Sequence, residues 1–248
     1  MIKLKTPEEI EIMRRAGRIV AETLEMVGEN LKPGMTTGKL NEMIEEYIRS
    51  KDAIPAFLNY QGFPASACVS IDEEVVHGIP GKRVIREGEI VSVDVGSIFE
   101  GFYGDAARTF AVGEVSEQKL HLMETTEKCL RAGIDKARNG NKLGQISAAV
   151  QQVAENEGYG VVRQLVGHGI GRKMHEEPQV PNYGSAQEGP VLKTGMVLAI
   201  EPMINMGTYE VKTLPDGWTF VTLDGQPSAH FEHTVAITED GPDILTLV

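Results

Sequence analysis

The sequence has little of several residue types, and each shortage excludes a class of protein. Its 248 residues include only two cysteines, Cys68 and Cys129, which excludes a disulfide-stapled secreted domain and favours a reducing compartment. No run of about 18 apolar residues is present, so neither a membrane span nor a signal peptide is expected. We therefore expect a cytoplasmic protein.

Basic residues are scarce relative to acidic ones. The chain has 24 Lys and Arg against 36 Asp and Glu, a formal net charge of −12, which repels phosphate backbones. Neither nucleic acid nor a membrane is expected as a direct partner. With 41% hydrophobic residues, a chain of this length can still bury a large core, and we expect one catalytic domain over residues 1–248.

Helix and strand signals alternate along the chain. Thr6 and Glu9 form a capping box with proline at the first helical position, which predicts that a helix begins there. Apolar residues at helical spacing extend it toward residue 27. The later predicted elements are a helix to about residue 50, β-rich runs over 54–112, helices from Ser116 and Leu143, and β-rich runs from 161 onward.

Two segments of the chain resemble each other. Gly88 to Asp94 and Gly195 to Glu201 each contain a glycine, one variable residue, four mostly apolar residues and a carboxylate. A His-Gly-Ile motif precedes each segment and a second acid follows it; these residues are His77, His168, Asp105 and Glu232. We expect two α/β halves, at about 54–112 and 161–240, related by a pseudo-twofold axis. Each half would then supply two carboxylates to a shared centre.

The first pair of acids is predicted to lie on one face of a hairpin. If Glu100 and Gly101 form a two-residue turn, Asp94 lies opposite Ala107, and Asp105 points to the same side of the sheet. Asp94 follows a buried apolar run, where a bare carboxylate would lack several kcal/mol of solvation. Such an acid needs a cation or strong hydrogen-bond donors.

Four carboxylates in one centre require positive charge. At about 4 Å, each pair would repel by roughly 4 kcal/mol at an effective dielectric constant near 20. Two divalent ions would balance four negative charges, as in known binuclear sites. His168 is the best candidate for a nitrogen ligand, because the glycines on both sides of it let the backbone come close. One nitrogen among mostly oxygen donors favours Mn, Fe or Co over a purely structural Zn site.

These residues together resemble the type I methionine aminopeptidases. The resemblance covers essentially the whole chain and implies an α+β pita-bread fold, as in the creatinases and aminopeptidases, with a curved antiparallel sheet covered by helices. The chain is similar to the minimal bacterial form, although Leu165 stands where many members carry an aromatic residue. The resemblance rests on the five acids and histidines in order, Gly-His-Gly-Ile-Gly at 167–171, His175 to Tyr183, and Ile200-Glu-Pro-Met203.

The resemblance also implies roles for single residues. Asp105 and Glu232 would bridge two metal ions (Co, Mn, Fe or Zn). Asp94 would complete the ligands of one ion, and His168 with Glu201 would complete those of the other. The ions would activate a water for attack on the first peptide bond, and Glu201 would take its proton. His77 and His175 would be catalytic and contact the substrate, with His175 polarising the scissile carbonyl.

A methionine pocket is implied by the same resemblance. Aromatic residues in irregular backbone usually pack as loop anchors, but four residues here match positions that line the family's side-chain pocket: Tyr60, Phe63, Cys68 and Trp218. A thioether gains roughly 0.3–1.5 kcal/mol per contact with an aromatic ring. The expected activity is removal of the initiator methionine from nascent polypeptides when the second residue is small. We expect a monomer and leave contact with the ribosome open.

Three alternative functions fit the sequence less well. An Xaa-Pro aminopeptidase or prolidase would use the same five ligands, but those enzymes usually carry an additional N-terminal domain that about 50 residues before Ile54 cannot form. A non-catalytic pita-bread binding module should have lost ligands, and this chain keeps all five. A mononuclear iron oxygenase would need a second histidine ligand and fits four acids poorly.

We assign the remaining histidines, His121, His230 and His233, to surface or turn positions.

Overall fold

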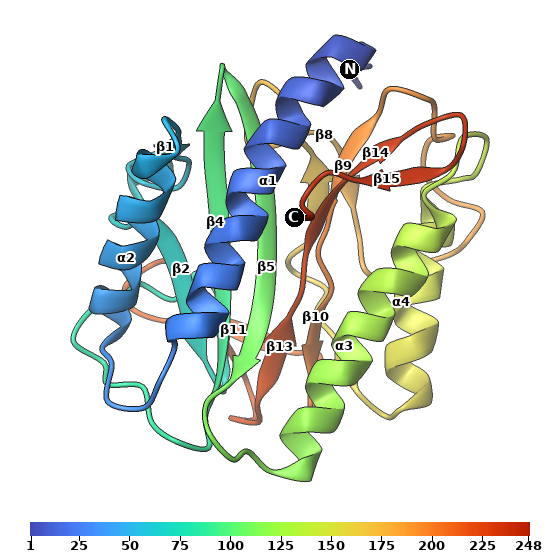
Figure 1. Ribbon diagram of the computed structural model, residues 1–248. Helices are drawn as coiled ribbons and strands as arrows, with labels where there is room; N and C mark the ends of the chain where they lie inside the picture. The colour runs from blue at the N-terminus through green and yellow to red at the C-terminus, as the bar shows by residue number, and fades with distance from the viewer.

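The computed structural model describes residues 1–248, and its helices lie against antiparallel sheets (Figure 1). The capping box is confirmed, because Thr6 Oγ1 accepts the Glu9 N–H and the Glu9 carboxylate accepts the Thr6 N–H. The helix start at Ser116 is confirmed by a bond from Lys119 N–H to its hydroxyl. The helices are α1 (Pro7–Asn30), α2 (Thr37–Ser50), η1 (Tyr60–Gly62), α3 (Glu117–Lys136) and α4 (Gly144–Asn156).

The first sheet contains the predicted hairpin. β4 and β5 turn at Glu100 and Gly101, both at positive φ, and Asp94 lies opposite Ala107 as predicted. α1 packs closely on this hairpin: a Cβ on Gly104 would lie 2.6 Å from the Gly17 nitrogen. The strands are β1 (Ile54–Pro55), β2 (Ala67–Ile71), β4 (Ile90–Phe99) and β5 (Phe102–Ala111), in the order β1-β4-β2 with β5 beside β4.

The second large sheet comes from the C-terminal part of the chain. Its order is β15-β14-β9-β7-β8, formed by β7 (Gly167–Gly169), β8 (Glu176–Val180), β9 (Val197–Ile200), β14 (His233–Ile237) and β15 (Pro242–Ile244). Two three-stranded sheets complete the fold. They are β13-β10-β6, with β6 (Gly160–Val161), β10 (Met203–Asn205) and β13 (Ser228–His230), and β11-β12-β3, with β3 (Glu74–Val76), β11 (Val211–Thr213) and β12 (Phe220–Thr222).

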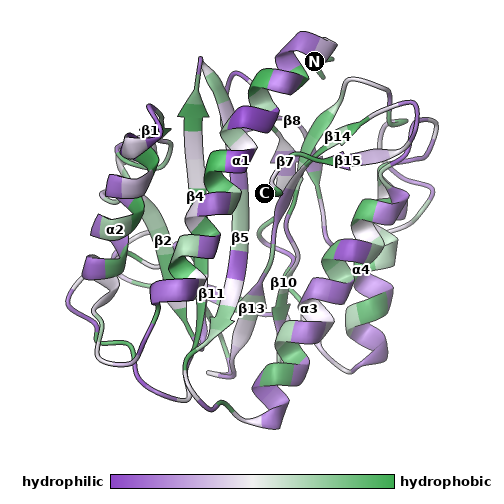
Figure 2. Cartoon of the chain, viewed as in Figure 1, coloured by the Kyte–Doolittle hydropathy of each residue, from purple (hydrophilic) through white to green (hydrophobic).

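Each large sheet has its own hydrophobic core. α1 and α2 bury their apolar faces against β2, β4 and β5, with Val20, Ile44 and Val93 all fully buried. α3 and α4 pack against β9 and β14 around Leu130 and Val150. Hydrophilic and hydrophobic residues alternate along these helices, as expected when one face is solvated (Figure 2). None of the helices combines the length and apolar composition needed to span a bilayer.

Hydrogen bonds join β5 to β14 and thereby connect the two sheets. The Asp105 N–H donates to Thr234 Oγ1 at 3.1 Å, and the Thr234 hydroxyl donates to the Asp105 carbonyl at 2.8 Å. The Glu232 N–H donates to the Ala107 carbonyl at 2.9 Å. Acids from the two halves of the sequence therefore meet along this junction.

Candidate active site

One cavity of about 170 Å³ brings together the residues singled out from the sequence. Carboxylates and histidines form one part of its wall, and aromatic side chains form another. Phe57, Gln61 and Met174 also line it. The predicted residues in its wall are Tyr60, Phe63, Cys68, His77, Asp94, Asp105, His168, His175, Glu201, Trp218 and Glu232.

Strand register places the four acids. Asp94 and Asp105 point to one face of the β4–β5 hairpin, as the register requires. In the second sheet, Ile200 of β9 pairs with His233 of the antiparallel strand β14. Glu201, which follows Ile200, and Glu232, which precedes His233, therefore lie side by side at the end of this strand pair. The main-chain bond from Glu232 to Ala107 then brings the second pair of acids against the first.

His168 is presented to the acids by a crowded backbone. A Cβ on Gly167 would lie 2.4 Å from the Ala199 carbonyl, and one on Gly169 would lie 2.3 Å from the Glu177 carbonyl, so glycine is required on both sides. The ring Nδ1 lies 2.9 Å from the Gly169 carbonyl, which fixes a proton on Nδ1. The lone pair of Nε2 therefore faces Glu201 Oε1 at 3.5 Å and Asp105 Oδ2 at 3.8 Å.

Burial of so many carboxylates opposes their ionisation. Burial raises the pKa of Asp94 from 3.8 to about 7. The pKa values of Asp105, Glu201 and Glu232 lie well above their ordinary range, first because they are buried and second because neighbouring carboxylates repel their charge. Burial lowers the pKa of His168 to about 4, so this imidazole is neutral at pH 7 and cannot neutralise the acids as a cation.

The donor set fits a metal ion. One ligand atom from each of Asp105, His168 and Glu232 lies within 4.8 Å of the other two. Asp94 Oδ1, Asp105 Oδ1 and Glu232 Oε1 are buried without any hydrogen-bond partner, a costly arrangement for carboxylate oxygens. Carboxylates with one neutral imidazole are suitable donors for a divalent transition metal. This cluster can therefore hold a divalent cation.

His175 lies beside the acids and contacts the Tyr60 hydroxyl. Its ring centroid lies 4.3 Å from that of His168, and its Nδ1 lies 2.7 Å from the Tyr60 hydroxyl. Burial lowers the pKa of His175, so the ring is neutral at pH 7. When Tyr60 donates its proton to Nδ1, the ring proton lies on Nε2. His175 is thereby equipped to donate a hydrogen bond into the cavity.

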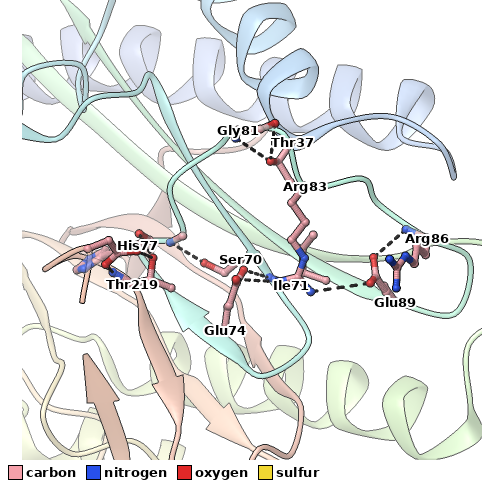
Figure 3. A network of polar contacts seen from close by, with 12 residues as sticks. Thr37, Ser70, Ile71, Glu74, His77, Gly81, Arg83, Arg86, Glu89 and Thr219 are labelled. Carbon is pink, nitrogen blue, oxygen red and sulfur yellow. Dashed lines mark hydrogen bonds and ion pairs between the residues drawn. The ribbon is translucent and has the colours of Figure 1, made fainter. Parts of the chain in front are cut away.

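His77 has a backbone conformation that the surrounding residues enforce. Its φ of 59° is left-handed, which is unfavourable for a residue with a side chain. The following Gly78 donates its N–H to Ser70 Oγ at 3.1 Å, next to His77 (Figure 3). Its carbonyl accepts the Val69 N–H at 2.9 Å. Burial lowers the pKa of His77 to about 4. The imidazole that reaches the cavity is therefore neutral.

The apolar part of the cavity lies next to the acids. The Phe63 and Trp218 rings meet edge to face with centroids 5.2 Å apart, and both Phe63 and Cys68 are buried. Cys68 of β2 pairs with Asp94 of β4, so the pocket and the carboxylates share a strand pair. This wall can accept an apolar side chain of a substrate whose backbone lies at the acids.

Some residues near the site were not identified from the sequence, and two histidine expectations were wrong. His233, expected at a surface or turn, begins strand β14, is partly buried, and has its Nδ1 2.8 Å from Thr246 Oγ1. Gln61 and Met174 adjoin predicted residues but match no chemical pattern of their own. His230, which we expected at a surface or turn, is only 1% exposed and lies 3.9 Å from Glu201 through its Nε2. It ends β13, and only the folding of β13 beside β10 reveals this position.

Comparison with known proteins agrees with the geometry of the site. The model of metallopeptidase family M24 matches residues 11–239. The methionine aminopeptidase of Clostridium acetobutylicum is 56% identical over 100% of this chain and 99% of its own length. The crystal structure of methionine aminopeptidase from Rickettsia prowazekii superposes with a TM-score of 0.98 at 45% identity over all of both chains.

A more distant structure separates fold from activity. The prolidase from Pyrococcus furiosus matches with a TM-score of 0.79 at 23% identity, over 99% of this chain but only 65% of the prolidase. At that identity the likeness shows the fold alone. The α+β pita-bread fold expected from the sequence is therefore confirmed.

Proposed function

Because this chain belongs to metallopeptidase family M24 and, within it, to the methionine aminopeptidases, we propose how its cavity removes an N-terminal methionine. The enzyme is a hydrolase that acts on the N-termini of polypeptides and releases the initiator methionine. The observation that carries the proposal is the meeting of four carboxylates and His168 beside an aromatic pocket in one cavity.

In this proposal five side chains would hold two divalent ions. The ligands would be the carboxylates of Asp94, Asp105, Glu201 and Glu232 and the imidazole of His168. The unpartnered buried oxygens of Asp94, Asp105 and Glu232 support this assignment, since a cation would satisfy them. Mn, Fe, Co or Zn would suit these donors. When bound, the ions supply Lewis acidity and a water whose pKa is lowered towards 7.

Proton transfer is assigned to Glu201. Its carboxylate would take a proton from the attacking water and return it to the leaving amine. The carboxylate also faces the Nε2 of His168 at 3.5 Å, so it is close to the proposed reaction centre. Glu201 would thus act both as a ligand and as the general base.

The two neutral histidines are assigned to the substrate. His175, with its proton on Nε2, would donate to the carbonyl oxygen under attack, where negative charge develops. His77 would hydrogen-bond around the scissile nitrogen and the tetrahedral intermediate. Their lowered pKa values keep both rings uncharged near pH 7, so neither repels a nearby cation.

Selectivity is assigned to two adjoining parts of the cavity. Tyr60, Phe63, Cys68 and Trp218 would enclose the methionine side chain, with favourable sulfur–aromatic contacts. The carbonyl under attack must come within about 3–3.5 Å of the nucleophile. A bulky second side chain would hold it away, so we expect cleavage only before small second residues.

The wider setting of the enzyme is also proposed. Residues 1–248 would form one catalytic domain whose halves, about 54–112 and 161–240, derive from the pseudo-repeat. Both cysteines are free and buried, which suits the reducing cytoplasm, and we expect the enzyme to act there as a monomer on nascent chains. Contact with the ribosome would bring it to those substrates.

Peptide assays with defined metals test this proposal. The chelator-treated protein is assayed on Met-Ala-Ser, Met-Ile-Ser and Ala-Pro-Ala after addition of Mn²⁺, Fe²⁺, Co²⁺ or Zn²⁺. We expect metal-dependent release of methionine from Met-Ala-Ser, little from Met-Ile-Ser and none of alanine from Ala-Pro-Ala. Cleavage of Ala-Pro-Ala would instead indicate Xaa-Pro activity, and full turnover without metal would refute the assigned chemistry. A protein inactive with every metal would be a binding module.

A further inference from the structure

His230 is a buried polar residue with an unexplained side chain. It ends β13, is only 1% exposed, and its Nε2 is buried without a hydrogen-bond partner. An unpaired buried nitrogen of this kind destabilises the fold. The nearest carboxylate oxygen is Oε2 of Glu201, at 3.9 Å. This separation is roughly 1 Å longer than a typical hydrogen bond, and such bonds are often long until a site is loaded.

The main chain of His230 is fixed by a chain of hydroxyl groups. Its N–H donates to Thr109 Oγ1 at 2.9 Å, and the Thr109 hydroxyl donates to the His230 carbonyl at 2.8 Å. Thr109 also lies 2.8 Å from the Ser92 hydroxyl, so Ser92 is left to act as the donor. These bonds tie β13 to both strands of the β4–β5 hairpin. The imidazole is therefore placed by two sheets.

Glu201 lies between two imidazoles. Its Oε1 is 3.5 Å from His168 Nε2, and its Oε2 is 3.9 Å from His230 Nε2. One oxygen thus faces the proposed ligand cluster and the other faces His230. A ligand carboxylate is oriented well only when its remaining oxygen also has a donor.

We propose that His230 is a positioning residue whose Nε2–H holds the outer oxygen of Glu201 and so orients this carboxylate for metal binding. The inference rests on the proposed role of Glu201 as a ligand. His230 touches no substrate in this account and acts only through Glu201. Removal of its donor should therefore weaken metal affinity, while the affinity for peptide stays unchanged.

A chelator competition on Mn²⁺-loaded protein tests the proposal directly. Bound Mn²⁺ is measured after equilibration with increasing chelator for wild type, His230→Leu, His230→Met and His230→Gln. The two apolar variants should lose about 10–100-fold in affinity. His230→Gln keeps an N–H donor and should stay within about threefold of wild type. His121→Leu, at an exposed histidine on α3, is the matched control and should change nothing.

Kinetics separate positioning from a purely structural role. For His230→Leu we expect an unchanged KM for Met-Ala-Ser and a low kcat at limiting Mn²⁺ that excess Mn²⁺ restores. The proposal is overturned if the folded Leu variant binds Mn²⁺ like wild type, or if the Gln variant loses as much affinity as the Leu variant. It is also overturned if neither apolar variant folds, because His230 would then serve the fold itself.

A parallel variant distinguishes this inference from the proposed function. Glu201→Ala should lose Mn²⁺ affinity by more than His230→Leu does, because it removes a ligand. If Glu201→Ala binds Mn²⁺ normally, the ligand assignment fails and the positioning role fails with it. If Glu201→Ala loses the metal while His230→Leu keeps it, only the positioning role fails.

Discussion

Treatment with a chelator should give this protein an unusual dependence of stability on pH. Asp94 has a pKa of about 7 in the fold against 3.8 as a free side chain, and the other three acids lie well above their ordinary values. At pH values between the pKa of a free acid and its pKa in the fold, the four carboxyl groups are ionised in the unfolded chain but still carry protons in the folded chain. The folded state then binds more protons, so its stability falls as the pH rises.

Buried histidines limit the range in which this effect can be seen. The pKa is about 4 for His77 and His168 and about 3 for His230, against 6.5 for a free imidazole. Below about pH 6.5 the unfolded chain gains protons that the folded chain does not, so stability falls as the pH falls. The carboxylates dominate above that value. Stability of the metal-free protein should therefore be greatest near pH 6.5.

The size of the effect follows from proton linkage. If the four acids together retain about one proton more than the unfolded chain, they lower stability by about 2 kcal/mol between about pH 6.5 and pH 8. The buried histidines, still partly protonated in the unfolded chain over this range, offset about half of that loss. For a chain of this size the net loss of about 1 kcal/mol is a decrease of about 2–4 °C in Tm. Bound cations would replace these protons, so the loaded protein should show a nearly level Tm over the same range.

Thermal unfolding followed by circular dichroism can measure this effect. Samples with chelator and samples with saturating Mn²⁺ are compared at intervals between about pH 6.5 and pH 8. Asp94→Asn, which removes one titrating acid, should reduce the slope in chelator. A metal-free Tm that stays level or rises with pH would refute the reasoning that places four mutually repelling carboxylates at this centre.

The remaining predictions concern single side chains. His168→Ala should abolish Mn²⁺ binding measured by metal analysis and reduce turnover by more than the roughly 10–100-fold expected for residues that only support a ligand. His175→Ala should keep its metal content but lower kcat by roughly 10²–10³, and an empty site in that variant would show that His175 is a ligand. Tyr60→Phe should lower kcat by about 3–10-fold, because His175 loses the donor that fixes its tautomer; unchanged kcat would argue against that role.

Local sequence signals predicted much of the site, because its acids lie at strand ends where register is determined by nearby turns. The positive φ values of Glu100 and Gly101 are what a two-residue hairpin needs, and the register of Asp94 followed from that turn. The close approach at Gly167 and Gly169 likewise follows from the glycines themselves.

The residues that sequence reasoning missed depend on contacts between separate sheets. His230 approaches Glu201 because β13 pairs with β10 and is tied to Thr109 of β5, and these are long-range placements. The contact of Tyr60 with His175 joins residues 115 positions apart, so no local period marks it. Such contacts become visible only once the sheets are assembled.

The location of the acids also connects metal binding with the packing of the two sheets. Asp105 and Glu232 carry two of the proposed metal-ligand carboxylates, and their main-chain N–H groups also donate hydrogen bonds that join β5 to β14 and the residue before it. Repulsion between their ionised side chains acts across the same junction that these bonds hold together. A cation between them would turn that repulsion into attraction. Metal binding should therefore stabilise the junction between the sheets, in addition to supplying the chemistry for peptide hydrolysis.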